Sequence, residues 1–226
     1  MRPLIHRICT QAPIKQQSSM QKPTPIIHVV DDDEGMRESI VSLLESHDWT
    51  VQAYSSADDF LHTARRDVPA CLILDIRMPG ADGFDLQSEL KRLGEKQSII
   101  FLTGHGTIPL SVKAMKEGAV EFLTKPFTES ELIAAVALAA QAVALRWQED
   151  EEAQSLRSKY ATLTEREKEV FAFVVSGRMN KVIASDLGIA EITVKVHRAR
   201  VTEKLAARSL ADLVRIATQL GIDIPT

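Results

Sequence analysis

The sequence has few of the features that mark disulfide-bonded or membrane-spanning proteins. It has only two cysteines among 226 residues, Cys9 near the start of the chain and Cys71 at the beginning of an apolar segment, so neither a disulfide nor a metal site is expected from them. The longest apolar run, ELIAAVALAAQAVALRW at 131–147, is rich in alanine and interrupted by Gln141, and it does not predict a membrane span. We therefore expect a soluble protein of a reducing cytoplasm, with no membrane partner.

The first 24 residues lack a continuous apolar segment of the length found in secretion signals. Their content of Pro, Gln and Ser is typical of chain that does not fold. We predict a disordered N-terminal extension over residues 1–24.

Charge is distributed unevenly along the chain. The composition, 45% hydrophobic and 26% charged, is that of an ordinary globular protein with one large domain or two small ones. The net charge is −4, yet residues 156–226 hold 12 Lys and Arg against 8 Asp and Glu, a balance of +4 that leaves −8 for residues 1–155. An acidic first part and a basic second part predict two domains with different partners.

Short apolar segments alternate with amphipathic helical segments from residue 26 onward. Five such repeats predict an α/β doubly wound (βα)5 domain with a parallel sheet, whose strands lie at 26–30, 50–54, 71–75, 98–103 and 119–124 and whose helix after the second strand covers 56–66. A long connector helix from about 129 to 158 follows. Thr164 and Glu167 then form a capping-box pattern, and four helices are expected at 163–177, 180–188, 190–206 and 210–221.

Reactive polar side chains stand at the ends of the predicted strands. Asp31 and Asp32 end the first strand, Asp75 the third, Thr103 the fourth, and Lys125 follows the fifth. The carboxyl ends of parallel strands meet at one edge, so these groups should converge. Three clustered carboxylates repel one another unless a cation sits among them, and oxygen ligands at this density suit Mg²⁺. Lys125 is expected to bind an anion that the metal also contacts.

The acidic turn also contains charges that are better explained by a helix start. Asp33 and Glu34 follow the first strand directly and should be favoured by the dipole of the next helix. His28 lies within a strand and His105 within a loop, and we assign neither a chemical role.

Four motifs, VVDDDE, LILDIRMPGADG, FLTGHG and FLTKPF, together resemble the receiver domain of two-component response regulators over residues 25–145. The resemblance implies that Asp75 accepts a phosphoryl group from a sensor histidine kinase. It implies that Thr103 and Lys125 meet the phosphoryl oxygens and that the Lys125–Pro126 bond is cis. The implied ligands of Mg²⁺ are Asp31, Asp32, Asp75 and the backbone carbonyl of Arg77.

The same resemblance implies a conformational switch. Thr103 moves toward the phosphoryl group and Phe122 turns inward behind it, altering a face formed by residues 108–123. We expect Val112, Lys116 and Phe122 on or near this face, and a homodimer when the protein is phosphorylated. The alternative is that Val112 and Phe122 belong to the core.

The basic segment 163–214 resembles the helix-turn-helix domain of the LuxR/NarL class through LTERE, NKVIASDLGI, TVKVHR and KLAARSLADLV. With the receiver-like part and a helical linker at 146–160, the chain resembles FixJ/NarL-type regulators and is similar to regulators of aromatic-hydrocarbon catabolism. The resemblance implies a DNA-binding domain over 161–226, double-stranded DNA with promoter half-sites and RNA polymerase as partners, and activation of transcription.

The third helix of this segment has one apolar and one polar face. Val194, Val201 and Leu205 share a stripe that should face the core. The opposite face and its flank predict base contacts from Lys195, Val196, Ala199 and Arg200. Arg198 points nearer the core, where a salt bridge or phosphate contact is expected. Phosphate contacts are predicted for Asn180, Lys181, Thr193 and Arg208 with Ser209.

Two other functions remain open from the residues alone. A Mg²⁺-dependent phosphatase also uses clustered aspartates, but the haloacid-dehalogenase type has a second Asp two residues after its nucleophile, where this chain has Arg77. The other alternative is a DNA-binding protein whose first domain only dimerises, which Asp75 and Lys125 argue against. We expect a regulator and no enzyme.

Overall fold

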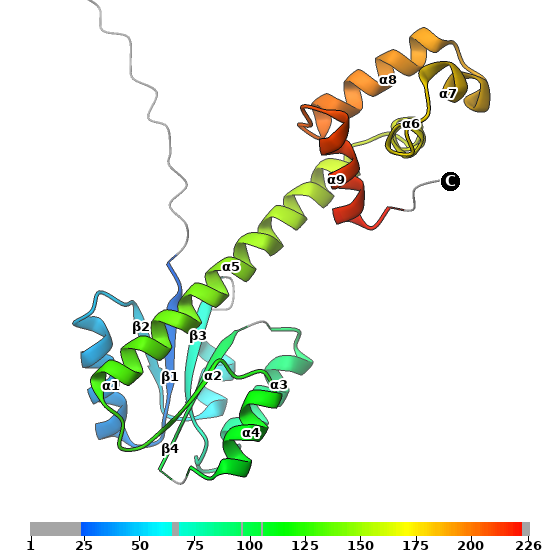
Figure 1. Ribbon diagram of the computed structural model, residues 1–226. Coiled ribbons are helices and arrows are strands. Elements are labelled where there is room, and N and C mark those ends of the chain that lie inside the picture. The colour runs from blue at the N-terminus through cyan, green and yellow to red at the C-terminus, as the bar shows by residue number, and fades with distance from the viewer. Residues whose placement is uncertain (1–23, 65–67, 96, 105, 223–226) are drawn as a thin grey trace, which may run out of the picture.

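The computed structural model describes residues 24–64, 68–95, 97–104 and 106–222, which form two lobes joined by one long helix (Figure 1). Nearly all of the predicted N-terminal extension, together with Cys9 and His105, lies outside the described residues.

The first lobe is built on a five-stranded sheet in which every neighbouring pair is parallel. The strand order is β2-β1-β3-β4-β5. This is the order of a doubly wound fold, so the predicted fold class is confirmed. The strands are β1 (Ile26–Val30), β2 (Val51–Tyr54), β3 (Ala70–Asp75), β4 (Ser98–Thr103) and β5 (Glu121–Thr124).

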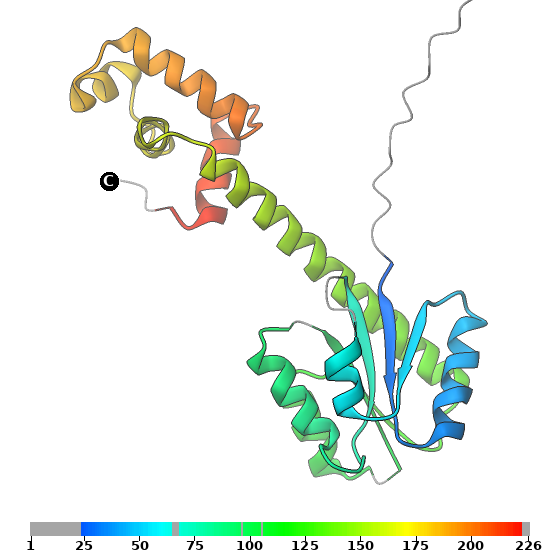
Figure 2. The same ribbon diagram turned by 180° about the vertical axis from the view of Figure 1, so that it is seen from behind.

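Helices cover both faces of this sheet, because the three central strands are apolar on both sides. Every residue of β1, β3 and β4 is buried. On β3, Leu72 and Leu74 join the hydrophobic cluster of one face, and Cys71 and Ile73 join that of the other. Figures 1 and 2 show the helical layers from opposite sides. The first face carries α2 (Ala57–Thr63), α3 (Gly83–Arg92) and α4 (Ile108–Lys116), and the second α1 (Glu34–Glu45) and α5 (Glu129–Ala161).

Local side chains fix where these helices begin. Asp33 caps α1 by accepting a hydrogen bond from the Met36 amide at 3.0 Å, which confirms its predicted place at a helix start. Thr128 and Glu131 form a capping box at the start of α5. Helix α2 ends at Thr63, earlier than the predicted 66, and residues 65–67 lie outside the described chain.

Helix α5 is continuous over 33 residues and joins the two lobes. Its buried residues, from Leu132 to Val143, lie in its first half, and Leu132 and Val136 pack against the sheet. By length and composition it is the one helix of the described chain that could cross a membrane, but a core helix has the same properties. The predicted connector is confirmed and ends three residues later than expected.

The second lobe of the described chain consists of four helices, as predicted. They are α6 (Glu165–Val175), α7 (Asn180–Leu187), α8 (Glu191–Lys204) and α9 (Leu210–Leu220). Phe171, Ile183 and Val201 lie in a common hydrophobic cluster. Gly188 ends α7 with a left-handed φ of 65°, a conformation that glycine adopts readily, and so permits the turn into α8.

Lys204 joins the end of α5 to an ion pair within the second lobe. Glu167 is 2% exposed, forms the capping box with Thr164, and accepts a hydrogen bond from Lys204 Nζ at 2.6 Å. Lys204 Nζ also donates to the carbonyl of Thr162, which caps the end of α5, at 3.0 Å. Lys204 therefore links α5, α6 and α8.

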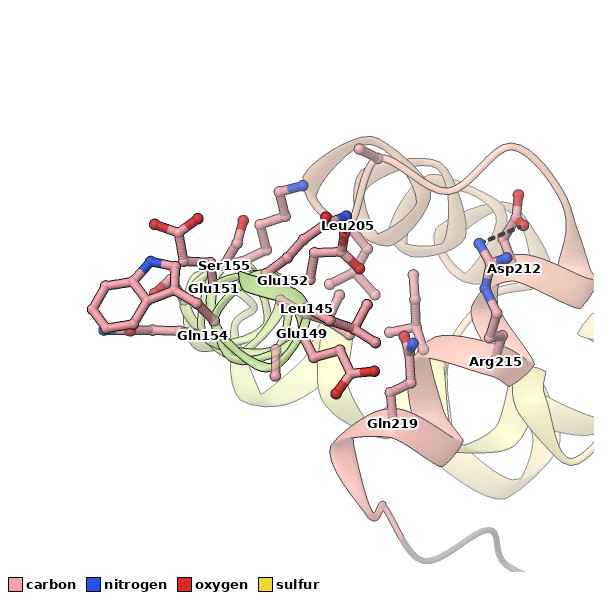
Figure 3. A pocket seen from close by; sticks show the side chains of 18 of the residues that line it. Leu145, Glu149, Glu151, Glu152, Gln154, Ser155, Leu205, Asp212, Arg215 and Gln219 are labelled. Atoms are coloured by element: carbon pink, nitrogen blue, oxygen red, sulfur yellow. Dashed lines mark hydrogen bonds and ion pairs between the residues drawn. The ribbon is translucent and has the colours of Figure 1, made fainter. Parts of the chain in front are cut away.

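A groove of about 1450 Å³ runs between α5 and the α8–α9 end of the second lobe (Figure 3). Glu149 and Glu152 of α5 line one wall, and Arg215 of α9, paired with Asp212, lines the other. Away from its final turns, α5 is therefore separated from this end of the second lobe by open space.

Candidate functional site

The strand order brings the predicted polar groups together at one edge of the sheet, the edge formed by the carboxyl ends of its strands. Asp31 follows β1, Asp75 and Thr103 are the last residues of β3 and β4, and Lys125 follows β5. Because β1, β3, β4 and β5 are successive neighbours, these positions adjoin. Ligand oxygens of Asp31, Asp32 and Asp75 lie within 4.8 Å of one another. The predicted convergence is present, with Asp31 and Asp75 buried and Asp32 exposed.

Lys125 reaches into this cluster and contacts two of the carboxylates directly. Its Nζ donates to Oδ2 of Asp31 and to Oδ2 of Asp75, both at 2.7 Å, and the side chain is only 16% exposed. The sequence predicts that this lysine lies opposite the carboxylates and binds an anion. In the structure it is the shared hydrogen-bond donor of Asp31 and Asp75.

The pKa values at this site reflect competition between burial and pairing. Loss of solvent raises the pKa of Asp31, and the hydrogen bond from Lys125 only partly opposes this. Burial by itself lowers the pKa of Lys125, but hydrogen bonds and Coulomb attraction from Asp31 and Asp75 outweigh it, and the net pKa is raised. Asp31 is the more deeply buried partner, so desolvation prevails for the acid while pairing prevails for the base.

Backbone groups hold the second oxygen of each buried carboxylate. Oδ1 of Asp31 accepts from the Asp33 amide at 2.9 Å, and Oδ1 of Asp75 accepts from the Arg77 amide at 3.1 Å. Arg37 donates to the backbone carbonyl of Asp31 at 2.7 Å. Each acid therefore has one oxygen on the backbone and the other on Lys125, which fixes its orientation.

Gly83 is a residue of this site that the sequence reasoning did not identify. It begins α3, and a Cβ at this position would lie 2.6 Å from the Asp75 carbonyl oxygen and 3.0 Å from Cα of Ile76. Only glycine permits this approach of α3 to the end of β3. The signal was present as the last letter of MPGADG.

The predicted switch residues lie on neighbouring strands, where Thr103 pairs with Thr124 and Phe122 pairs with Phe101. Thr103 is fully buried at the end of β4, and its carbonyl accepts from the Lys125 amide at 2.7 Å. Phe122 is half-buried and packs against the cluster that contains Phe101. The Lys125–Pro126 bond is cis, as predicted.

Helix α4 presents an apolar stripe to solvent beside β5. Ile108, Val112 and Met115 are all exposed, and Val112 is 45% exposed. Lys116 is exposed on the same helix. The alternative that Val112 belongs to the core is wrong, whereas Phe122 does pack partly against the core.

His28 is a core residue. Its Nδ1 lies 3.2 Å from the Tyr54 hydroxyl, and its ring packs against Tyr54 and edge-on against Phe60. These contacts agree with assigning it no chemical role.

The two faces of α8 are those predicted. Val194, Val201 and Leu205 are buried in the core. The side chains predicted to contact bases are all exposed: Lys195, Val196, Ala199 and Arg200. Among the predicted phosphate contacts, Asn180 and Thr193 are half-buried, and Lys181, Arg208 and Ser209 are exposed.

Arg198 makes a different contact from those expected. Its Nη1 donates to Oδ1 of Asn180 at 2.6 Å, so it joins α8 to the first residue of α7. Ser209, predicted beside a phosphate contact, caps α9 by accepting from the Asp212 amide. Ile192, a residue the sequence reasoning did not single out, is 67% exposed in the first turn of α8.

Comparison with known proteins accounts for both lobes. Residues 27–137 match the family described as "Response regulator receiver domain", and residues 161–217 match "Bacterial regulatory proteins, luxR family". Nodulation protein W of Bradyrhizobium diazoefficiens is 47% identical over 197 residues, which cover 87% of each chain. The chain belongs to the two-component response regulators that carry a LuxR-type DNA-binding domain.

Other relatives of this response regulator agree in sequence and in structure. Response regulator protein TodT of Pseudomonas putida is 43% identical over 86% of each chain. The structure of response regulator StyR matches 87% of this chain and 99% of its own with a TM-score of 0.81 and 44% identity. Full-length FixJ from B. japonicum matches 89% of this chain and 99% of its own at 37% identity, with a TM-score of 0.54.

Family membership settles the class of the protein. It is a transcription regulator of a two-component system, whose partners are a sensor kinase and DNA, and it is not an enzyme. The phosphatase alternative is thereby excluded. The receiver edge provides an acidic pocket of the kind in which response regulators bind a divalent cation.

Proposed function

We propose that Asp75 is the phosphoryl acceptor of this response regulator and that its modification controls DNA binding by the second lobe. The observation that carries the proposal is the convergence of Asp31, Asp32, Asp75 and Lys125 on one sheet edge. Oδ1 of Asp75 accepts a hydrogen bond from the Arg77 amide, and Oδ2 accepts one from the ammonium of Lys125, a flexible side chain that can change partners. One carboxylate oxygen attacks phosphorus as the bond to the kinase's histidine nitrogen breaks.

Mg²⁺ is the proposed cofactor of this step. Its ligands would be the carboxylates of Asp31, Asp32 and Asp75 and the backbone carbonyl of Arg77. The donor set fits, because it consists of oxygens alone and its three carboxylates lie close together while Lys125 pairs with only two of them. When bound, the ion supplies positive charge that offsets the repulsion between carboxylate and phosphoryl group.

Lys125 and Thr103 are the proposed contacts of the acquired phosphoryl group. Lys125 exchanges a carboxylate oxygen for a phosphoryl oxygen, and Thr103 supplies a hydroxyl donor from the neighbouring strand. Phe122, on the neighbouring strand β5, follows Thr103 inward. The aspartyl phosphate then shifts an existing equilibrium between two arrangements of this edge.

The α4–β5 face is the proposed site of homodimerisation on phosphorylation. Ile108, Val112 and Met115 form an exposed apolar stripe there, Lys116 lies beside it, and Phe122 is in the adjoining strand. A dimer would place two second lobes on paired promoter half-sites.

For DNA, α8 is the proposed reading helix, with Lys195, Val196, Ala199 and Arg200 on the bases. The N-cap residues of α7 and α8, Met179 and Ala190, make no side-chain capping bond within the described chain, whereas Thr164 and Ser209 do cap α6 and α9. Uncapped N–H groups suit phosphates, which supports contacts from Asn180, Lys181 and Thr193 on these helices and from Arg208 nearby. Recruitment of RNA polymerase and activation of transcription in the cytoplasm complete the proposal.

The proposed domains are an extension at 1–24, a receiver at 25–145, a linker at 146–160 and a DNA-binding domain at 161–226.

The test of the phosphoryl acceptor is incubation of full-length protein with acetyl phosphate and Mg²⁺, followed by intact-mass measurement. Wild type should gain the mass of one phosphoryl group and Asp75→Asn should not. Asp33→Asn is the matched control, since it removes a charge from the same turn but keeps a side chain that caps α1. An equal gain of mass in Asp75→Asn would refute the assignment.

A further inference from the structure

The outer face of α8 begins with an apolar residue that the core does not use. Ile192 is 67% exposed, and none of the hydrophobic clusters found among the described residues contains it. Val196, four residues later, is 44% exposed. Residues four apart lie on the same helix face one turn from each other, so the two side chains form an exposed apolar pair.

Charge surrounds this pair. Lys195 and Arg200 are exposed on the same helix, and Lys195 Nζ lies 3.2 Å from Glu191 at the start of α8. A single exposed apolar residue needs no explanation. Two apolar side chains one helical turn apart, flanked by cations on the outer face of the proposed DNA-reading helix, are complementary to a surface that is both apolar and anionic. That surface is the major groove, where phosphates meet the cations and the 5-methyl group of thymine is the apolar feature of the base edges.

We propose that Ile192 and Val196 read the methyl groups of two thymines in each operator half-site, and that Ile192 is therefore a specificity-determining residue. This inference rests on the proposed role of α8 in DNA binding. Ile192 lies in the first turn of α8, and the N-terminal residues of a recognition helix are those that reach base edges. Lys195, between them in sequence, supplies the polar contact to guanine.

The spacing of the pair limits the sequence it reads. Cβ atoms four residues apart on a helix are separated by about 5–6 Å. Successive base pairs are stacked about 3.4 Å apart. The two methyl groups should therefore lie one or two base steps apart, on either strand.

The test uses DNA that the protein itself selects. Full-length wild type, treated with acetyl phosphate and Mg²⁺, is used to enrich binding sites from a random duplex pool, and each thymine of the enriched site is then replaced singly by deoxyuridine, which lacks only the methyl group. Loss of a buried methyl should weaken binding about fourfold at two positions one or two steps apart.

Protein variants then assign each methyl to a side chain. Ile192→Ala should lose sensitivity to deoxyuridine at one of the two positions and keep it at the other, and Val196→Ala should do the reverse. Leu145→Ala, which truncates a 59% exposed leucine on α5, should retain both sensitivities. Because Ile192 is exposed, its truncation should leave the melting temperature unchanged, which excludes misfolding as the cause.

The outcomes separate this inference from the function on which it rests. Enriched sites that show no deoxyuridine sensitivity, or an Ile192→Ala protein that keeps both sensitivities, would overturn the methyl-reading role while leaving DNA binding intact. Failure of wild type to enrich any sequence would overturn the DNA-reading function of α8 itself.

Discussion

Lys125 Nζ lies 2.7 Å from Oδ2 of Asp75, the carboxylate proposed to take the phosphoryl group, and the same nitrogen lies 2.7 Å from Asp31. One ammonium therefore donates to two acids from neighbouring strands, Asp31 after β1 and Asp75 at the end of β3. In this arrangement the proposed acceptor is oriented by the group that would later hold its phosphoryl oxygens. In the proposed function, activation at this edge is an exchange of partners by Lys125, from a carboxylate oxygen to a phosphoryl oxygen.

Replacing Asp31 by Asn should weaken Mg²⁺ binding. Asp31 is a proposed direct ligand, so the loss of its charge should cost more than the roughly 10–100-fold typical of partners that only orient a ligand. Isothermal titration calorimetry with MgCl₂ measures this affinity. Asp33→Asn serves as control and should bind like wild type, and a similar loss in that control would mean that bulk acidity, not ligation, attracts the ion.

Replacing Gly83 by Ala should impair the acceptor without touching its carboxylate. The new Cβ would meet the Asp75 carbonyl oxygen at 2.6 Å, so β3 and α3 must separate. Such overpacking costs about 1–3 kcal/mol in the free energy of unfolding, measured by urea denaturation. The rate of phosphorylation by acetyl phosphate should fall as well.

A substitution on the exposed face of α3 provides the comparison for Gly83→Ala. Ser88→Ala lies in the same helix and should change neither stability nor rate. If Gly83→Ala behaved like Ser88→Ala, close approach of α3 to Asp75 would not matter for the site.

The sequence was sufficient to locate this edge but not to describe the contacts within it. Apolar runs with Asp75 and Thr103 at their ends predict a parallel sheet, and parallel strands necessarily share one edge. Which donor orients Asp75 depends on distances across the sheet, and strand order alone does not give them. Gly83 was missed for the same reason, since its neighbour is the backbone of another element.

In the second lobe, too, the sequence periodicity predicts which residues are buried but not which side chains contact one another. The 3.6-residue repeat correctly separated Val194 and Val201 from the exposed face of α8. It could not show that Arg198 would bond Asn180 across two helices, and it gave no reason to inspect Ile192 until its exposure was known.

The Glu167–Lys204 pair should make stability of the second lobe depend on pH. The hydrogen bond from Lys204 lowers the pKa of Glu167 below its ordinary value of 4.5. The stabilisation is therefore present above the unfolded-state pKa and is lost as the pH falls through the lower folded-state pKa. Thermal unfolding between pH 6 and about pH 3 should show a smaller decline for Glu167→Gln than for wild type.

An exposed acid on the same helix controls for loss of charge alone. Glu169→Gln should leave the pH dependence as in wild type, because Glu169 makes only an exposed pair with Arg166. Equal pH profiles for Glu167→Gln and wild type would show that the Glu167–Lys204 pair does not stabilise the lobe.

Lys195 and Lys181 should have different effects on DNA recognition. Lys195→Ala should cost about 1–3 kcal/mol at the selected site and relax the preference at one base pair. Lys181→Ala should weaken binding to all sequences alike and reduce the salt slope by about 1. Fluorescence anisotropy with selected and random duplexes at several salt concentrations distinguishes the two, and a uniform loss for Lys195→Ala would remove it from the base contacts.

Binding of selected DNA with and without phosphorylation tests the central claim most directly. Wild type treated with acetyl phosphate and Mg²⁺ should bind the selected duplex more tightly than untreated protein. It should also sediment on the duplex as a dimer, because phosphorylation of Asp75 is proposed to favour pairing through the α4–β5 face. Asp75→Asn should show neither change. An unchanged affinity in treated wild type, or an equal gain in Asp75→Asn, would contradict control of DNA binding through Asp75.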